Sequence, residues 1–210
     1  MKDIIRKVDS STPVGPSIRE AAQIILNGGV VVFPTTGLYG MGAEAHDTSA
    51  IKRVFGVKKR PAHKPILILV PERAAIRDLV EEIPPAAEKI MRRFWPGGVT
   101  LIFRAQPDVS PLLTAGSGKI GIRLPAYPVA AKLVSTVGAP ITGTSANLSG
   151  EPGASDVNNL PQEIIDGVDM VLDAGPLIGG PGSTVVDITA DPPTVLREGA
   201  LSKSELIKIL

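Results

Sequence analysis

The chain has 210 residues, of which 43% are hydrophobic, so it is long and apolar enough to form one domain with a full core. Its 22 basic and 21 acidic residues nearly balance, so the net charge neither indicates nor excludes a nucleic-acid partner. The lack of cysteine excludes a disulfide framework, a thiol nucleophile and a cysteine-ligated metal.

No targeting segment is recognised at the start of the chain. Residues 1–7 lack the apolar core of a signal peptide, and no apolar run reaches the length that spans a membrane. We therefore expect a cytoplasmic protein without membrane contact. Neither a repeat nor a linker divides the sequence, so we expect one domain over residues 1–210, with its core at about 15–200.

Helical and strand-like patterns alternate along the chain. Apolar residues at helical spacing within 18–25 predict a first helix, with a capping box of Ser17 and Glu20 at its start and Gly28-Gly29 at its end. Residues 30–33 are apolar throughout, which is typical of a strand buried on both faces. Further strands are expected at 66–70, 99–103, 120–124, 141–142, 170–172, 185–188 and 195–196, and further helices from Ser49, twice between 71 and 95, and at 128–137, 161–166 and 202–209.

Polar and cationic residues follow the ends of these runs. Lys58 and Arg60 come after the second predicted helix, and Ser145 and Asn147 come after the strand at 141–142. Loops at strand ends are where an α/β scaffold holds its ligand. The sequence therefore predicts a site for a phosphorylated ligand, assembled from segments that lie far apart in the chain.

The residue types in these segments suit particular chemical groups. Lys58 and Arg60 lie two residues apart, so on an extended segment both side chains would point the same way and bind one triphosphate. Ser145 and Asn147 share that spacing and offer two neutral hydrogen-bonding groups. Arg123, in a strand-end position, would hold a carboxylate or phosphate with paired hydrogen bonds, or else form a structural salt bridge.

Several weaker features are ambiguous or fail. Gly37, Gly40 and Gly42 either let a ligand approach the backbone or only permit a tight turn. The basic residues between 52 and 64 either face a ligand or form an ordinary solvated helix face. Residues 116–119 look like a phosphate loop but lack its first glycine and its final Ser or Thr. The two histidines of the chain are too few for a His-based metal site.

A set of short motifs in a fixed order carries a family resemblance. The motifs are Pro34-Thr35 with Tyr39-Gly40, Lys58-x-Arg60-Pro61, Phe94-Trp95-Pro96-Gly97 with Thr100, Arg123-Leu124-Pro125, Ser145-Ala146-Asn147, Gly182-Ser183-Thr184-Val185-Val186-Asp187 and Leu196-Arg197-Glu198-Gly199. Together they resemble the YrdC-type threonylcarbamoyl-AMP synthases, in their short, single-domain form. The chain departs from the family after Pro34-Thr35, where members often carry an acidic residue and a Thr or Ser but this chain has Thr36 and Gly37.

The resemblance implies a fold and an activity. The fold would be α/β, a single domain with a twisted mixed β-sheet flanked by helices (YrdC/RibB-like) and a large concave basic cavity. The activity would be that of a nucleotidyltransferase, which condenses L-threonine, bicarbonate and ATP, with Mg²⁺, to threonylcarbamoyl-AMP and pyrophosphate. A partner tRNA threonylcarbamoyl-transferase would then transfer the threonylcarbamoyl group to an adenosine beside the anticodon of tRNA.

The resemblance also implies roles for individual residues. Thr35, Arg123 and Ser183 would contact L-threonine. The residues assigned to ATP are Lys58, Arg60, Lys119, Ser145, Asn147 and Arg197. Lys58 and Arg60 would also be catalytic, because they would stabilise the charge that develops on the phosphates. No residue is assigned as a metal ligand.

An alternative is a non-catalytic protein of the same fold that binds tRNA or other double-stranded RNA. The basic residues between 52 and 64 would serve an RNA backbone. Few aromatic residues lie among them, which argues against stacking of single-stranded bases.

Residues 148–160 are expected to form a long loop, and we expect this loop to close the cavity.

Overall fold

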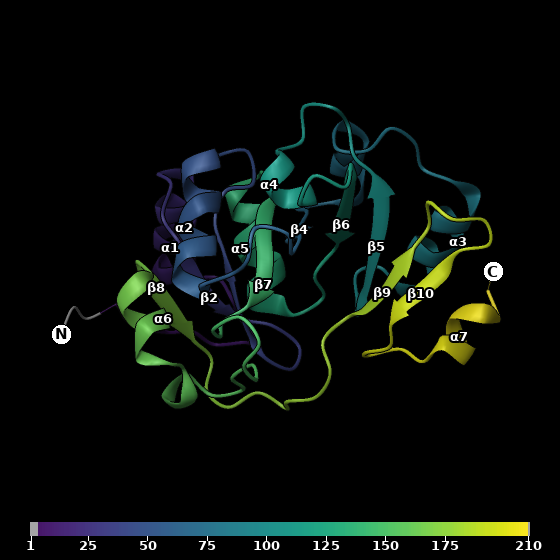
Figure 1. Ribbon diagram of the computed structural model, residues 1–210. Coiled ribbons are helices and arrows are strands. Elements are labelled where there is room, and N and C mark those ends of the chain that lie inside the picture. The colour runs from purple at the N-terminus through teal and green to yellow at the C-terminus, as the bar shows by residue number, and fades with distance from the viewer. Residues whose placement is uncertain (1–3, 210) are drawn as a thin grey trace.

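Ten strands join in one sheet within residues 4–209, which are the residues that the computed structural model describes (Figure 1). The strands are β1 (Ile5–Lys7), β2 (Val31–Pro34), β3 (Tyr39–Gly42), β4 (Leu67–Leu69), β5 (Val99–Arg104), β6 (Lys119–Arg123), β7 (Ile141–Ser145), β8 (Met170–Asp173), β9 (Thr184–Asp187) and β10 (Thr194–Arg197). The helices are α1 (Pro16–Leu26), α2 (Thr48–Lys58), η1 (Arg73–Asp78), α3 (Pro85–Phe94), α4 (Pro111–Thr114), α5 (Pro128–Val137), η2 (Val157–Asn159), α6 (Gln162–Gly167) and α7 (Lys203–Ile207), of which η1 and η2 are 3₁₀-helices.

The sheet is mixed, as the family resemblance implies. Its strand order is β1-β8-β2-β3-β7-β4-β6-β5-β9-β10. The pairs β1–β8, β2–β8, β4–β6 and β5–β9 are parallel, and the remaining neighbours are antiparallel. Strands from both ends of the chain are therefore neighbours of strands from its middle, so loops that are distant in sequence meet at one sheet. No helix in the described part of the chain is long and apolar enough to cross a membrane.

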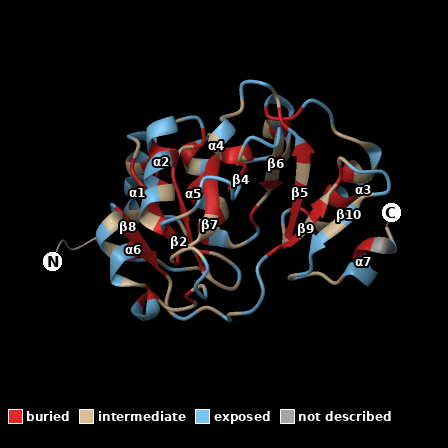
Figure 2. Cartoon of the chain, in the orientation of Figure 1, coloured by how far each residue is buried: buried red, intermediate tan, exposed pale blue. Residues whose placement is uncertain are grey.

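Both faces of the central strands are covered, which explains the continuous apolar run of β2. Val31 and Phe33 pack with α1 and α5 on one face of the sheet. Val30 and Val32 belong to the larger core on the other face, which includes residues of α2 and α3. Figure 2 shows the central strands as almost entirely buried, while the outer surfaces of the helices are exposed. A strand of this kind needs apolar side chains in both directions.

Two of the expected helix starts are wrong. The N-cap of α1 is Gly15, which has no side chain to cap the helix, and Pro16 is the first helical residue, so no capping box of Ser17 and Glu20 forms. The N-cap of α2 is Asp47 rather than Ser49. Its carboxylate accepts hydrogen bonds from the backbone N–H groups of Ser49 and Ala50, at 2.7 and 3.1 Å. A capping box does form at the start of α7, between Ser202 and Glu205.

The segment that holds Gly37, Gly40 and Gly42, where we expected a tight turn or a backbone approached by a ligand, contains the strand β3. This strand pairs with β2 on one side and with β7 on the other. A Cβ atom on Gly42 would lie 2.3 Å from the Thr142 carbonyl oxygen, so only glycine lets these backbones approach so closely. Because glycine is uncommon in strands, Gly40 and Gly42 hid the strand pattern of this buried segment. The strand β1 and the short helix α4 were also not predicted, because three or four residues carry too little periodicity.

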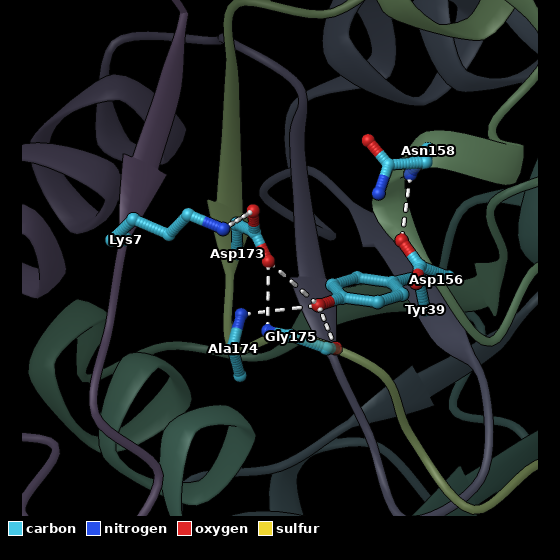
Figure 3. Close-up of polar contacts among 7 residues, drawn as sticks. All are labelled: Lys7, Tyr39, Asp156, Asn158, Asp173, Ala174 and Gly175. Atoms are coloured by element: carbon cyan, nitrogen blue, oxygen red, sulfur yellow. Dashed lines mark hydrogen bonds and ion pairs between the residues drawn. The ribbon is translucent and has the colours of Figure 1, made fainter.

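Tyr39 fixes the start of the segment that follows β8. Its side chain is fully buried, and its hydroxyl donates to the Gly175 carbonyl at 2.8 Å and accepts from the Ala174 N–H at 3.0 Å (Figure 3). Asp173 lies beside it and forms an ion pair with Lys7 of β1 at 2.5 Å. Burial raises the pKa of Tyr39, so the phenol stays protonated and keeps its donor. The turn into residues 174–183 is therefore locked to the sheet.

Replacing Tyr39 with Phe tests this lock. The substitution leaves a partly buried carbonyl and a partly buried N–H without their partner, so we expect the free energy of unfolding to fall by about 1 kcal/mol. Urea denaturation followed by circular dichroism measures it. Tyr127→Phe is the matched control, because its hydroxyl makes no hydrogen bond within residues 4–209. Equal stability of the two variants would contradict the proposed lock.

Candidate functional site

A cavity of about 1090 Å³ opens over β4, β5, β6, β7 and β9. Its walls include the turn between β2 and β3 and the segment 178–183, which runs along the lower edge of the molecule in Figure 1. The volume is at the upper end of the range for small-molecule sites, so more than one small ligand can be accommodated. Seven of the nine predicted site residues line it: Thr35, Arg60, Lys119, Arg123, Ser145, Ser183 and Arg197.

Two arginines on the cavity wall lie close enough to influence each other. The Arg123 Nε donates to the Gly97 carbonyl at 2.7 Å, and Arg197 donates to the Ser183 carbonyl at 2.8 Å. Burial, and then the positive charge of Arg197, lower the pKa of Arg123. Within residues 4–209 no acidic side chain forms an ion pair with either guanidinium. Two neighbouring cations without a counter-charge favour an anionic ligand such as a carboxylate or phosphate.

A buried pair of hydroxyls lies next to these arginines. The Ser183 Oγ and the Thr100 Oγ1 are 2.7 Å apart, and both residues line the cavity. The Arg197 guanidinium also reaches the Ser183 hydroxyl, at 3.4 Å. The sequence motifs include Thr100 but assign it no ligand. The parallel pairing of β5 with β9 brings its hydroxyl beside that of Ser183. This pair of hydroxyls, beside a cation, suits the polar groups of an amino acid.

Arg60, in the segment after α2, also lines the cavity. Its Nε donates to the Lys64 carbonyl at 3.1 Å, and one terminal nitrogen donates to the Pro65 carbonyl at 2.7 Å. Burial lowers the pKa of Arg60, and in the described part of the chain the residue has no acidic partner. The guanidinium thus holds the loop 60–65 in place and still presents positive charge to the cavity.

Lys119, the lysine that lines the cavity, forms an ion pair. Lys119 Nζ lies 2.9 Å from Asp187 Oδ2, and Asp187 is the one acidic residue that lines the cavity within residues 4–209. Thr189 donates to the other oxygen of that carboxylate at 2.6 Å through its hydroxyl. Sequence reasoning gave Asp187 no role, although its position at the end of β9 could have indicated one. The expectation that the cavity is positively charged overall stays a prediction.

Lys58 and Asn147 do not line the cavity. Lys58 is the last residue of α2, so the expectation of an extended segment with Lys58 and Arg60 on one side is wrong. The Lys58 side chain is 1% exposed, and its ammonium donates to the Ser145 carbonyl and, at 2.6 Å, to the Asn147 carbonyl. Burial, followed by the charge of Arg60, lowers the pKa of Lys58 to about 8. That both residues contact ATP stays a prediction.

The turn between β2 and β3 is shaped by the segment that lies against it. Thr35 closes the turn with its hydroxyl and its N–H, which both donate to the Leu38 carbonyl, at 2.6 and 3.1 Å. The Gly179 N–H donates to the Gly37 carbonyl at 3.0 Å, and a Cβ on Gly37 would lie 2.4 Å from the Gly179 carbonyl oxygen. The departure from the family pattern at Gly37 thus has a steric reason in this chain.

Residues 148–160, which we expected to form the closing loop, do not line the cavity.

Within residues 4–209 no group of three or more His, Cys, Asp or Glu side chains could hold a metal ion. The carboxylate of Asp187 is already occupied by Lys119 and Thr189. The residues present therefore offer no preformed cage for a divalent cation. A cation that needs oxygen ligands would reach this cavity bound to the phosphates of a ligand.

Comparison with known proteins identifies the family. Residues 23–199 match Sua5_yciO_yrdC, a family described as "Telomere recombination". The threonylcarbamoyl-AMP synthase of Pyrococcus abyssi is 37% identical over 193 residues, which is 92% of this chain and 57% of that protein. The protein of the same name from Bacillus subtilis is 36% identical over 196 residues, or 93% of this chain and 57% of that one.

The fold agrees with these relatives. The crystal structure of Pyrococcus abyssi Sua5 complexed with L-threonine superposes with a TM-score of 0.91 at 36% identity, and covers 99% of this chain and 61% of that one. This chain thus spans less than two thirds of the length of these relatives. The ordered motifs, the match over most of the chain and the shared fold establish that the chain belongs to the Sua5/YciO/YrdC family.

Proposed function

We propose that this chain is a nucleotidyltransferase that makes threonylcarbamoyl-AMP and pyrophosphate from L-threonine, bicarbonate and ATP. One observation carries the proposal: three arginines without acidic partners in the described residues and a pair of hydroxyls line a single large cavity. Relatives at 36–37% identity carry the name of this synthase, and a solved relative was crystallised with L-threonine. Both facts support the same assignment.

The ligands would divide the cavity between them. L-threonine would lie at Arg123, Ser183 and Thr35, where a guanidinium can bind its carboxylate and hydroxyls can bind its polar groups. ATP would lie toward Arg60, Lys119, Ser145 and Arg197, where the cations face its phosphates. Lys119 would exchange Asp187 for a phosphate when ATP binds. Mg²⁺ would enter with ATP as part of the substrate.

The reaction needs positioning and charge stabilisation rather than a protein nucleophile. The amine of threonine forms a bond to the carbon of bicarbonate, water is lost, and a carbamate results. A carbamate oxygen then attacks the α-phosphorus of ATP, and the bond to the leaving pyrophosphate breaks. Because the carbamate decomposes in water, the cavity must hold it beside ATP and away from bulk solvent. Arg60 and Lys119 would stabilise the charge on the departing pyrophosphate.

The product would serve a tRNA threonylcarbamoyl-transferase, which is the partner that the resemblance implies. The cytoplasmic location and direct binding of tRNA or double-stranded RNA stay predictions. The RNA-binding alternative lacks a specific observation in its favour, because the features that the structure adds all concern a cavity of small-molecule size.

The decisive experiment measures pyrophosphate release by the purified chain with ATP, Mg²⁺ and bicarbonate, with and without L-threonine. We expect release that depends on threonine and is poorly supported by serine. Mass spectrometry would identify threonylcarbamoyl-AMP among the products. A folded chain that binds duplex RNA but releases no pyrophosphate would overturn the proposal and favour the RNA-binding alternative.

Arg60→Ala tests the phosphate side of the cavity. Losing one well-placed donor to the developing charge should lower the turnover by roughly a hundredfold or more, about 3 kcal/mol. Steady-state pyrophosphate release measures it. Arg77→Ala is the matched control, because Arg77 is exposed on η1 and lies outside the cavity. If Arg60→Ala turns over like this control, Arg60 has no role in the reaction.

Thr100→Val tests the threonine side. The substitution keeps the shape of the side chain but removes the hydroxyl that holds Ser183 at 2.7 Å. The loss of one such hydrogen bond, about 1 kcal/mol, should raise the KM for L-threonine by roughly fivefold and leave the KM for ATP unchanged. Thr136→Val, on α5 and outside the cavity, serves as the control. An equal rise in both KM values would show that the hydroxyl pair does not belong to the threonine site.

A further inference from the structure

The Lys58 side chain is buried and hydrogen-bonded to the backbone, as is typical of a residue with a structural role. It is 1% exposed, and its ammonium donates to the carbonyls of Ser145 and Asn147. The backbone of the same residue is held as well, because its carbonyl accepts the Ser149 N–H at 2.8 Å. One lysine thus makes three contacts with a five-residue stretch that lies 87 or more positions further along the chain.

The stretch that Lys58 holds is the turn after β7, residues 145–149. Ser145 lines the cavity, whereas Asn147 does not, and the Asn147 amide donates to the Leu148 and Glu151 carbonyls, at 2.7 and 2.6 Å. The Asn147 Oδ1 is buried and has no hydrogen-bond partner within residues 4–209. An unpaired buried acceptor costs stability, so the turn keeps this shape only because other contacts impose it. Lys58 supplies three of those contacts, two through its ammonium and one through its backbone carbonyl.

We propose that Lys58 is a positioning residue, which shapes the turn 145–149 so that Ser145 meets ATP, and that it does not contact ATP itself. The inference rests on the proposed function, because it assumes that ATP occupies this cavity. The three N–H groups of an ammonium on a flexible stem can reach both carbonyls. To reach the phosphates, the lysine would have to abandon both of them. The buried Asn147 carbonyl would then have no donor within residues 4–209, and the Ser145 carbonyl would keep only the Asn147 N–H, at 3.0 Å.

A double-mutant cycle tests the proposal with binding of ATP measured by isothermal titration calorimetry. Lys58→Met removes the donor and keeps the length of the side chain, so it should weaken ATP binding by about tenfold or more. If Lys58 acts through the turn, Ser145→Ala adds less than about twofold to that loss, because the displaced hydroxyl has already lost its contact. The affinity for L-threonine should stay unchanged. Lys52→Met, an exposed lysine on the same helix, is the control.

Losses that multiply would overturn the proposal, because independent contacts with a ligand are additive in free energy. Equal weakening of threonine and ATP binding by Lys58→Met would also overturn it, since a general structural role would explain the loss. If the wild-type chain binds no ATP, both this inference and the proposed function fail. The two outcomes can be told apart. If the wild type releases pyrophosphate only with threonine, but the losses of ATP affinity in Lys58→Met and Ser145→Ala multiply in the double variant, only this inference is refuted.

A second measurement uses the wild-type chain and does not depend on whether Lys58→Met folds. Lysine acetylation read by mass spectrometry compares the free chain with the ATP-bound chain. We expect Lys58 to stay unmodified in both, whereas Lys119, whose side chain is 38% exposed, should react in the free chain and be protected by ATP. Modification of Lys58 in the free chain that ATP suppresses would place the ammonium in the ligand site and overturn the proposal.

Discussion

The cavity depends on one kind of interaction, the hydrogen bond from a long side-chain donor to the backbone carbonyl of a loop. Arg60 holds Pro65, Arg123 holds Gly97 and Arg197 holds Ser183. Tyr39 holds Gly175 in the same way, and Lys58 holds the turn after β7. Backbone carbonyls removed from water must be paired, and loops offer no regular partners. Long donors from distant segments therefore fix each loop around the cavity.

Cationic side chains are well suited to this task, and their charge then serves the ligand. A guanidinium has five N–H donors, so it can bond a carbonyl and still face the cavity. The arginines have no acidic counter-ions within residues 4–209, which leaves positive charge on a wall that is partly buried. The loops are shaped before any ligand arrives, and preorganised charge stabilises a transition state without the cost of reorganisation. The net charge of +1 conceals this concentration of charge.

The lysine and the arginine of the Lys58-x-Arg60 motif have different surroundings in the fold. The helix α2 ends at Lys58, and Lys59 then adopts a left-handed conformation with φ 49°. This reversal sends Lys58 into the interior and Arg60 toward the cavity, although the two lie only two positions apart. Residue spacing predicts a shared direction only when the backbone is extended. The local conformation, which depends on where the helix ends, decides the direction instead.

The alternation of helices and strands follows from the sequence alone, and its ordered motifs also point to the family, to the α/β fold and to the seven candidate residues that line the cavity. Apolar periodicity and ordered motifs are local signals, so they survive without coordinates. Only the tertiary structure revealed that the glycine-rich stretch after Pro34 contains a strand, because the close backbone approach at Gly42 involves a distant residue. It likewise brought Thr100 to Ser183 and Asp187 to Lys119, and turned Lys58 away from the cavity. These arrangements depend on strand pairing across the chain, and no short sequence pattern records such pairing.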